Sequence, residues 1–166
     1  MQSKLLLGAA AAFMAVIVSA CGDTTPSATA PSPSPAASPS SPATAGATIM
    51  VATDSKLGAI LVDGNGKTVY LFVADQGTAS TCYTSCATVW PPVLTTGAPA
   101  AGTGATASLL GTTTRTDGKV EVTYAGHPLY YFIQDKKAGD TTGQGVNGFG
   151  GLWWVLSPAG AAITTK

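Results

Sequence analysis

The stretch that decides the fold is Tyr-Leu-Phe-Val-Ala-Asp at residues 70–75, because it returns as Tyr-Tyr-Phe-Ile-Gln-Asp at residues 130–135. Two upstream glycines recur at the same spacing in each copy, Gly58 and Gly66 in the first, Gly118 and Gly126 in the second. A match this regular indicates an internal duplication, in which each copy supplies one half of a shared core. We therefore predict two pseudo-symmetric repeats of about 60 residues, 48–107 and 108–166.

Short apolar segments separated by Gly and Asn turns are typical of β-strands. They lie at residues 49–51, 59–62, 67–73, 119–124, 129–134 and 151–157. Within residues 67–73 both faces are apolar, which indicates a central strand buried on both sides. The one helical candidate is residues 82–89, near the cysteine pair and ended by two prolines. We predict an all-β domain over residues 48–166, with antiparallel repeats that form one small sandwich or closed sheet.

The start of the chain predicts export. Lys4 precedes an apolar run at residues 5–18 that is too short to span a bilayer, as expected of a signal peptide over residues 1–20. The sequence Val-Ser-Ala-Cys ending at Cys21 resembles the bacterial lipobox, in which the cysteine is acylated. We expect Cys21 to anchor the protein to the outer face of a bacterial membrane, within the cell envelope. The alternative is ordinary cleavage that leaves Cys21 as a free thiol.

The segment after Cys21 differs in composition from the rest of the chain. Residues 22–46 are almost entirely Ser, Pro, Ala, Thr and Gly. Such a segment buries too little apolar surface to offset its ordering entropy. We therefore predict that residues 21–47 form a disordered tether that begins with the lipidated cysteine.

The charge balance restricts the partners. Eight basic and eight acidic residues give a net charge of zero, so no basic surface is expected for nucleic acid. Contact with the membrane is instead expected through acylated Cys21. The remaining expected partner is an envelope protein, a glycan or a small ligand whose identity the sequence does not specify.

The cysteine pair has the spacing of one helical turn. Cys82 and Cys86 would have Cα atoms about 6 Å apart, within reach of a disulfide in an oxidising compartment. Redox exchange and a metal site that includes His127 are the alternatives. His127 is the one histidine of the chain and lies in a turn where the first repeat has Lys67. We expect a structural disulfide, with no metal and no cofactor.

The duplicated aromatic–aspartate motif has two interpretations. In the structural one, the aromatic rings fill the core and each aspartate caps the turn after its strand. In the functional one, Tyr70, Asp75, Tyr130 and Asp135 gather around a pseudo-twofold axis as a duplicated binding site. We favour the structural interpretation and keep these four residues as candidate contacts.

Two adjacent tryptophans are further candidate contacts. Core packing is the default for such rings, but Trp153 and Trp154 point to opposite faces of the last strand. The alternative is therefore that at least one of them is partly exposed and contacts a glycan or a protein.

Three sequence features together carry a family resemblance: the two copies of Tyr-x-Phe-x-x-Asp, the segment Cys82-x-x-x-Cys86-Ala87-x-x-Trp90-Pro91-Pro92, and residues 123–132. They resemble the bacterial secreted-repeat lipoproteins with a Tyr-x-(Phe/Trp/Tyr)-x-x-Asp motif. The resemblance implies export and frequent lipid anchoring, and it names no activity.

No catalytic arrangement is evident in the sequence. There is no Gly-x-Ser-x-Gly elbow, and no two acidic residues stand out as a catalytic pair. We therefore predict that the protein is not an enzyme but a non-catalytic binding or interaction module at the cell surface. The alternative is an envelope redox or electron-transfer accessory that uses Cys82–Cys86 or a bound cofactor.

Overall fold

The computed structural model describes residues 46–165. The predicted signal peptide, Cys21 and most of the predicted tether lie outside the described residues. Ala47, assigned to the end of the tether, donates its N–H to Thr95 Oγ1 and accepts the N–H of Ala100. Ala47 is therefore already part of the folded domain.

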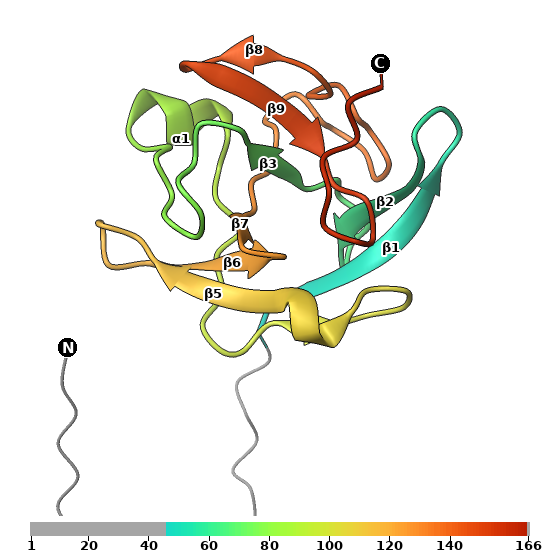
Figure 1. The fold of residues 1–166 in the computed structure, drawn as a ribbon, viewed down its shortest axis with the longest axis horizontal. Helices are drawn as coiled ribbons and strands as arrows, with labels where there is room; N and C mark the ends of the chain where they lie inside the picture. The colour runs from blue at the N-terminus through green and yellow to red at the C-terminus, as the bar shows by residue number, and fades with distance from the viewer. Residues whose placement is uncertain (1–45, 166) are drawn as a thin grey trace, which may run out of the picture. The chain divides into compact units, whose positions relative to one another are not determined.

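The domain is built from three small sheets (Figure 1). The first has the order β2-β1-β4, with β1 (Thr48–Asp54), β2 (Gly58–Asp63) and β4 (Ala100–Ala101). The second has the order β3-β9-β8, with β3 (Tyr70–Phe72), β9 (Gly151–Val155) and β8 (Asn147–Gly148). The third has the order β5-β6-β7, with β5 (Leu110–Thr114), β6 (Val120–Tyr124) and β7 (His127–Pro128). The all-β prediction is confirmed, although the strands do not join into a single closed sheet.

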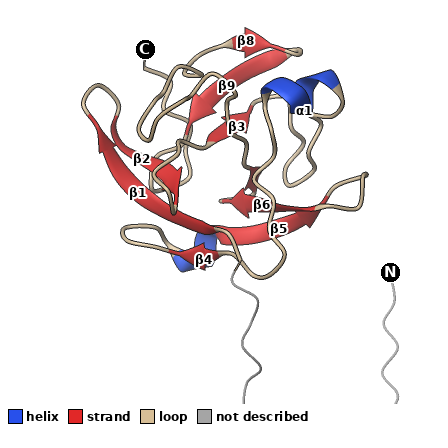
Figure 2. Cartoon of the chain, turned by 180° about the vertical axis from the view of Figure 1, so that it is seen from behind, coloured by secondary structure: helices blue, strands red, loops and turns tan. Residues whose placement is uncertain are grey.

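Helical structure is limited to two short segments among residues 46–165 (Figure 2). These are α1 (Ser85–Val89) and the 3-10 turn η1 (Ala107–Leu109). The predicted helix near the cysteines is therefore present but shorter than residues 82–89. In the described part of the chain, no helix has the length and apolar character needed to cross a membrane.

The duplication is visible in the backbone. The β1–β2 hairpin is matched by the β5–β6 hairpin, and both are antiparallel. Gly66 and Gly126 hold φ angles of 79° and 83° in the turn that follows each hairpin, a conformation that glycine adopts without steric cost. The halves meet where Tyr70 and Tyr130 exchange both backbone hydrogen bonds, at 2.8 and 3.0 Å. A pseudo-twofold axis thus passes between the two motif tyrosines.

The motif strands are shorter than predicted. Of residues 67–73 only Tyr70–Phe72 form a strand, and residues 129–134 contribute only isolated bridges from Tyr130 to Tyr70 and Pro92. The reason is that N–H groups along this segment donate to different neighbouring segments. Val69 donates to Leu61, whereas Val73 donates to Leu152. No single strand pairs with the whole segment, so no long hydrogen-bonded ladder forms.

Strand β5 was not predicted. Its sequence Leu-Gly-Thr-Thr-Thr has only one large apolar residue, so it shows none of the alternation that marks a half-buried strand. It pairs with all five residues of β6, and this pairing, rather than its own composition, makes it a strand.

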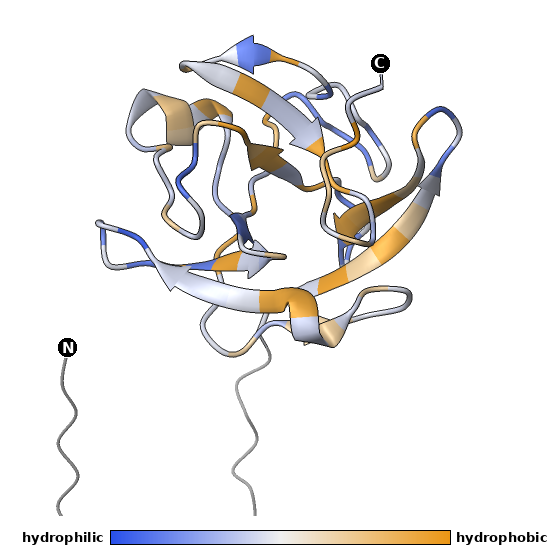
Figure 3. Ribbon diagram, viewed as in Figure 1, coloured by the Kyte–Doolittle hydropathy of each residue, from blue (hydrophilic) through white to orange (hydrophobic). Residues whose placement is uncertain are grey.

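The core consists of two clusters on opposite faces of β3 and β9, and Figure 3 shows β3 among the most hydrophobic segments. The first cluster contains Trp153, which is fully buried, and the second contains Trp154, which is 7% exposed. Core packing therefore holds for both tryptophans, and the alternative of an exposed one is wrong, because both faces of β9 are covered.

Candidate functional site

The two motif copies exchange hydrogen bonds across the pseudo-twofold axis. The Tyr70 hydroxyl donates to Asp135 Oδ2 at 2.7 Å, and the Tyr130 hydroxyl donates to Asp75 Oδ2 at 2.8 Å. Each tyrosine therefore uses the aspartate of the other copy. The four motif residues form one cluster between the repeats, and both tyrosine rings are fully buried.

Each aspartate also fixes the loop that follows it. Asp75 Oδ1 accepts the N–H and the hydroxyl of Thr81, at 2.7 and 2.8 Å. Asp135 Oδ1 accepts the same two groups from Thr142. Each carboxylate thus connects its own loop to the tyrosine of the other repeat.

Burial controls the ionisation of this cluster. It raises the pKa of Tyr70, and the hydrogen bond to Asp135 raises it further. Burial also raises the pKa of Tyr130, and the nearby charge of Glu121 adds to that shift. Burial raises the pKa of Asp75, although the hydrogen bonds from Thr81 act in the opposite direction. Both phenols therefore remain protonated donors at neutral pH.

Four aromatic rings form a continuous stack beside the tyrosines. Phe72 stacks on Trp153, Trp153 on Trp90, and Trp90 on Phe132, with centroid distances of 4.0, 4.0 and 4.2 Å. The two motif phenylalanines lie at the ends and the two tryptophans in the middle. The stack therefore follows the same pseudo-twofold symmetry as the tyrosine–aspartate pairs.

A buried ion pair breaks this symmetry. Arg115 Nη1 donates to Glu121 Oε2 at 2.8 Å, and both side chains are at most 1% exposed. The same guanidinium donates to Ser80 Oγ at 2.6 Å and to the Cys82 carbonyl at 2.7 Å. Its carbon also lies 4.4 Å from the ring centroid of Tyr83. Arg115 of the second repeat thus holds the cysteine loop of the first repeat.

The ion pair is connected to the motif cluster. The Ser80 and Tyr130 hydroxyls are 2.7 Å apart, and the Tyr130 proton is directed to Asp75. Ser80 is therefore the donor to Tyr130. A chain of donors runs from Arg115 through Ser80 and Tyr130 to Asp75.

Glu121 is the most perturbed acid of this region. Burial raises its pKa to about 7, although the bond to Arg115 opposes the shift. Its Oε1 atom is buried and has no hydrogen-bond partner among the described residues. In the first repeat the Leu61 carbonyl accepts the N–H of Val69, and in the second the Val122 carbonyl accepts the N–H of Leu129. Leu61 and Val122 therefore correspond, and so do the residues that precede them, Ile60 and Glu121. The second repeat carries a charge where the first is apolar.

The cysteines form the expected disulfide, with Cα atoms 5.2 Å apart. Cys82 is fully buried and Cys86 is 6% exposed, and both belong to the same core cluster as Trp90. Thr84, inside the disulfide loop, has a φ of 49°, in the region that favours glycine. The loop is therefore locally constrained.

His127 and Asp75 line one small hollow of about 290 Å³, whose other walls include Leu71 and Val73. Within residues 46–165 no group of three or more His, Cys, Asp or Glu side chains is arranged to hold a metal ion.

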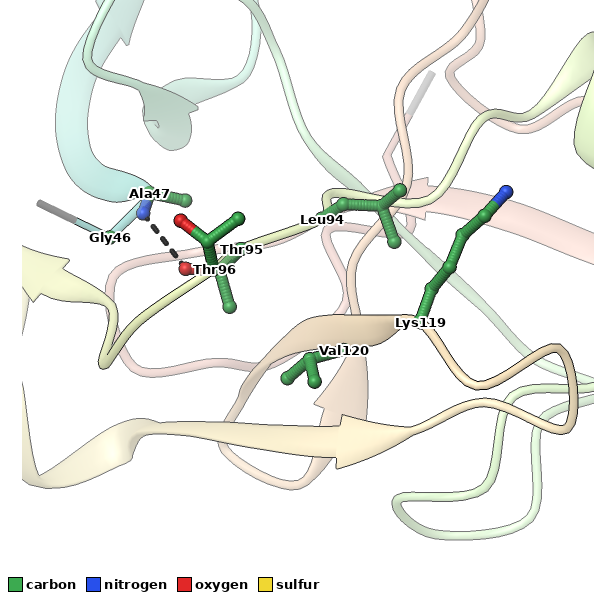
Figure 4. Close-up of a pocket in the computed structure, with 7 residues that line it drawn as sticks. All are labelled: Gly46, Ala47, Leu94, Thr95, Thr96, Lys119 and Val120. Carbon is green, nitrogen blue, oxygen red and sulfur yellow. Dashed lines mark hydrogen bonds between the residues drawn. The ribbon is translucent and has the colours of Figure 1, made fainter. Parts of the chain in front are cut away.

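A larger hollow lies on the surface near the start of the described chain. This Leu94 hollow has a volume of about 620 Å³ and is lined by Gly46, Ala47, Leu94, Thr95, Thr96, Lys119 and Val120. Figure 4 shows these residues coming from the start of β1, the 94–96 segment and the start of β6. Leu94 and Val120 are 42% and 37% exposed, so the hollow presents aliphatic side chains to solvent.

The predicted residues fall into separate groups. Tyr70, Asp75, Tyr130 and Asp135 lie together, whereas Trp153 is in the stack and Trp154 lies on the other face of β9. Sequence reasoning missed the buried ion pair and the Leu94 hollow. The duplication contained a signal for the first, because at its 60-residue spacing the charged Glu121 falls where the first repeat has the apolar Leu61.

Two copies of one β-unit that share a tyrosine–aspartate cluster define a two-repeat β-domain. The chain belongs to the family described as a secreted repeat of unknown function, whose model matches residues 51–94 and 111–157. The two matched segments correspond to the two repeats, and membership identifies the domain as an extracellular module. No curated protein and no solved structure matches the chain significantly.

Proposed function

We propose that this protein is a lipid-anchored module of the bacterial cell envelope that binds another envelope protein through the Leu94 hollow, without catalysis. The observation that carries this proposal is the hollow itself, an open apolar surface on a domain whose two motif tyrosines are fully buried. Concave apolar surfaces with a few polar groups are the usual places where proteins bind partners.

The lining of the hollow favours a peptide segment over a glycan. Leu94 and Val120 provide aliphatic contact, but none of the described residues that line the hollow is aromatic and could stack against a sugar. Lys119 stands at the rim with 60% of its side chain exposed, although Asp117 lies 3.7 Å from its ammonium group. The best match is an extended segment with an apolar side chain next to an acidic one.

The anchor is the second part of the proposal. It is supported by the lipobox-like sequence ending at Cys21 and by the secreted family. Mass spectrometry of the N-terminal peptide from membranes should find acyl chains on Cys21. Cys21→Ser should release the protein from the membrane fraction, and a variant that stays bound would contradict the anchor.

A matched pair of variants tests the binding surface. Leu94→Asp places a charge in the hollow. Ile133→Asp places a charge outside it, at a residue of similar exposure, 44%, that lines none of the hollows described above. A photocrosslinking amino acid at position 94, in cells of the source bacterium, should capture one discrete protein that position 133 does not capture. Val120→Asp should abolish the crosslink. Equal capture at both positions, or capture that Val120→Asp leaves intact, would contradict the proposal.

The redox alternative has less geometric support. A thiol exchange partner must reach a sulfur atom, and both cysteines are almost completely buried. If the Cys82–Cys86 disulfide of the folded protein is reduced at a mild potential, the redox alternative becomes the better supported of the two functions.

A further inference from the structure

We propose that Tyr70 and Tyr130 are sites of reversible one-electron oxidation, reached through the Trp90–Trp153 stack, with Asp135 and Asp75 as the proton acceptors. This inference goes beyond the proposed binding function and does not depend on it. It rests on how the rings, the phenols and the carboxylates are arranged in the core.

The electron path is made of the two tryptophans and the two tyrosines, the side chains that lose an electron most readily apart from cysteine thiols. Trp90 and Trp153 are parallel to within 4° at 4.0 Å, so their π systems overlap. Tyr70 meets Trp90 edge-on at 5.4 Å, and Tyr130 meets Trp153 edge-on at 5.2 Å. A positive charge placed on either tryptophan therefore has a tyrosine in contact with it.

The proton path decides where that charge comes to rest. An oxidised phenol is a strong acid, so tyrosine is oxidised easily only when a base takes its proton. Asp135 and Asp75 accept the phenol protons at 2.7 and 2.8 Å. Burial raises the pKa of both phenols, so they lose the proton together with the electron and not beforehand.

The reaction is balanced with an external one-electron oxidant. One electron leaves the tyrosine for the oxidant through the tryptophans, and the O–H bond breaks. The proton forms an O–H bond on the aspartate, which leaves a neutral tyrosyl radical beside a neutral carboxylic acid. Return of one electron and the same proton restores the starting state.

Tyr124 provides a matched control inside the same domain. It is also fully buried, but its hydroxyl donates to the Pro158 carbonyl at 2.8 Å, an oxygen that is far too weak a base to take the proton. It belongs to the other core cluster, away from the stacked tryptophans. Tyr124 should therefore not hold the radical.

The test is flash-quench oxidation of the full chain with photogenerated ruthenium(III) tris-bipyridine, followed by electron paramagnetic resonance and transient absorption. Wild type and Tyr124→Phe should both give a long-lived tyrosyl radical. Tyr70→Phe with Tyr130→Phe should lose most of that signal, and tryptophanyl radical should accumulate in its place. An undiminished tyrosyl signal in the double variant, or an equal loss in Tyr124→Phe, would overturn the proposal.

The aspartates give a second test that does not depend on the double tyrosine variant folding. Asp75→Asn with Asp135→Asn keeps the size of the side chains but removes both bases. Tyrosyl radical formation should slow strongly and tryptophanyl radical should persist, while the circular dichroism spectrum stays that of the wild type. If the aspartate variant folds and forms the radical at the wild-type rate, the proton acceptors are assigned wrongly.

Discussion

The two halves of the core share one plan, but only the second contains the buried ion pair of Arg115 and Glu121 among the described residues. Around Tyr70 the neighbouring strand contributes Ile60, which packs in the same cluster. Around Tyr130 the equivalent position is Glu121, which pairs with Arg115. The comparison teaches that both repeats share the packing of the motif, while only the second has a charged pair that holds the cysteine loop. We call the Arg115–Glu121 pair the charged clamp. Buried ion pairs are weak evidence for stability, so we infer that the role of the charged clamp is to position that loop.

The largest predicted effect comes from breaking the clamp. Arg115→Ala leaves Glu121 buried without its partner, which should lower the free energy of unfolding by about 3–5 kcal/mol. Arg115→Met with Glu121→Ile removes both charges and gives position 121 the isoleucine of the first repeat, so it should recover most of that loss. Chemical denaturation measures both variants. A double variant no more stable than the single one would show that the two halves differ in more than this pair.

The next effect is a dependence on pH. Because burial raises the folded-state pKa of Glu121 to about 7 from an ordinary 4.5, the folded protein holds a proton that the unfolded chain releases. This contribution to stability is complete below pH 4.5 and is lost as the pH rises to 7, by on the order of 3 kcal/mol. The difference between wild type and Arg115→Met/Glu121→Ile, measured across that range, isolates it from the other carboxylates. If the stability difference between the two proteins does not change with pH, Glu121 is not the group that titrates in this range.

The cysteine pair should have a smaller effect. Cys82→Ala with Cys86→Ala opens a loop closed by residues only four apart, so the entropy model gives a loss of about 2 kcal/mol. The melting temperature should fall accordingly. An unchanged melting curve together with a lost electron-transfer phenotype would replace the structural role with a redox one.

The smallest effects separate the two tyrosines. Tyr70→Phe and Tyr130→Phe should each cost about 1–3 kcal/mol, because each leaves a carboxylate with one donor fewer. Both hydroxyls also accept a bond, which is 2.7 Å long between Ser80 and Tyr130 but 3.3 Å long from the Gly143 N–H to Tyr70. Tyr130→Phe should therefore cost more, because the acceptor it removes serves the shorter bond. If thermal denaturation shows equal losses of stability for the two variants, the bond from Ser80 to the Tyr130 hydroxyl contributes nothing measurable.

The duplication explains how much was predictable. Matching glycines and motif residues were sufficient to predict two β-repeats. The pseudo-twofold cluster of Tyr70, Asp75, Tyr130 and Asp135 was only the alternative that we did not favour, because packing alone explained the repeated motif. The cross-connection was not predictable, because strand register alone does not say which aspartate each hydroxyl reaches. Strand β5 is a strand because it pairs with β6, and Trp154 is buried because the second core cluster covers it, so alternation within each segment could not reveal either feature. The Leu94 hollow combines three separate segments and leaves no contiguous pattern.

The exchange of hydrogen bonds between the repeats is the central claim, and a pair of double-mutant cycles tests it most directly. The first cycle compares the unfolding free energies of Tyr70→Phe, Asp135→Asn and the double variant. The second cycle does the same for Tyr70→Phe and Asp75→Asn. The structure predicts a coupling of about 0.5–3 kcal/mol for Tyr70 with Asp135 and almost none for Tyr70 with Asp75. A coupling of Tyr70 to the aspartate of its own repeat, and none to Asp135, would contradict the account.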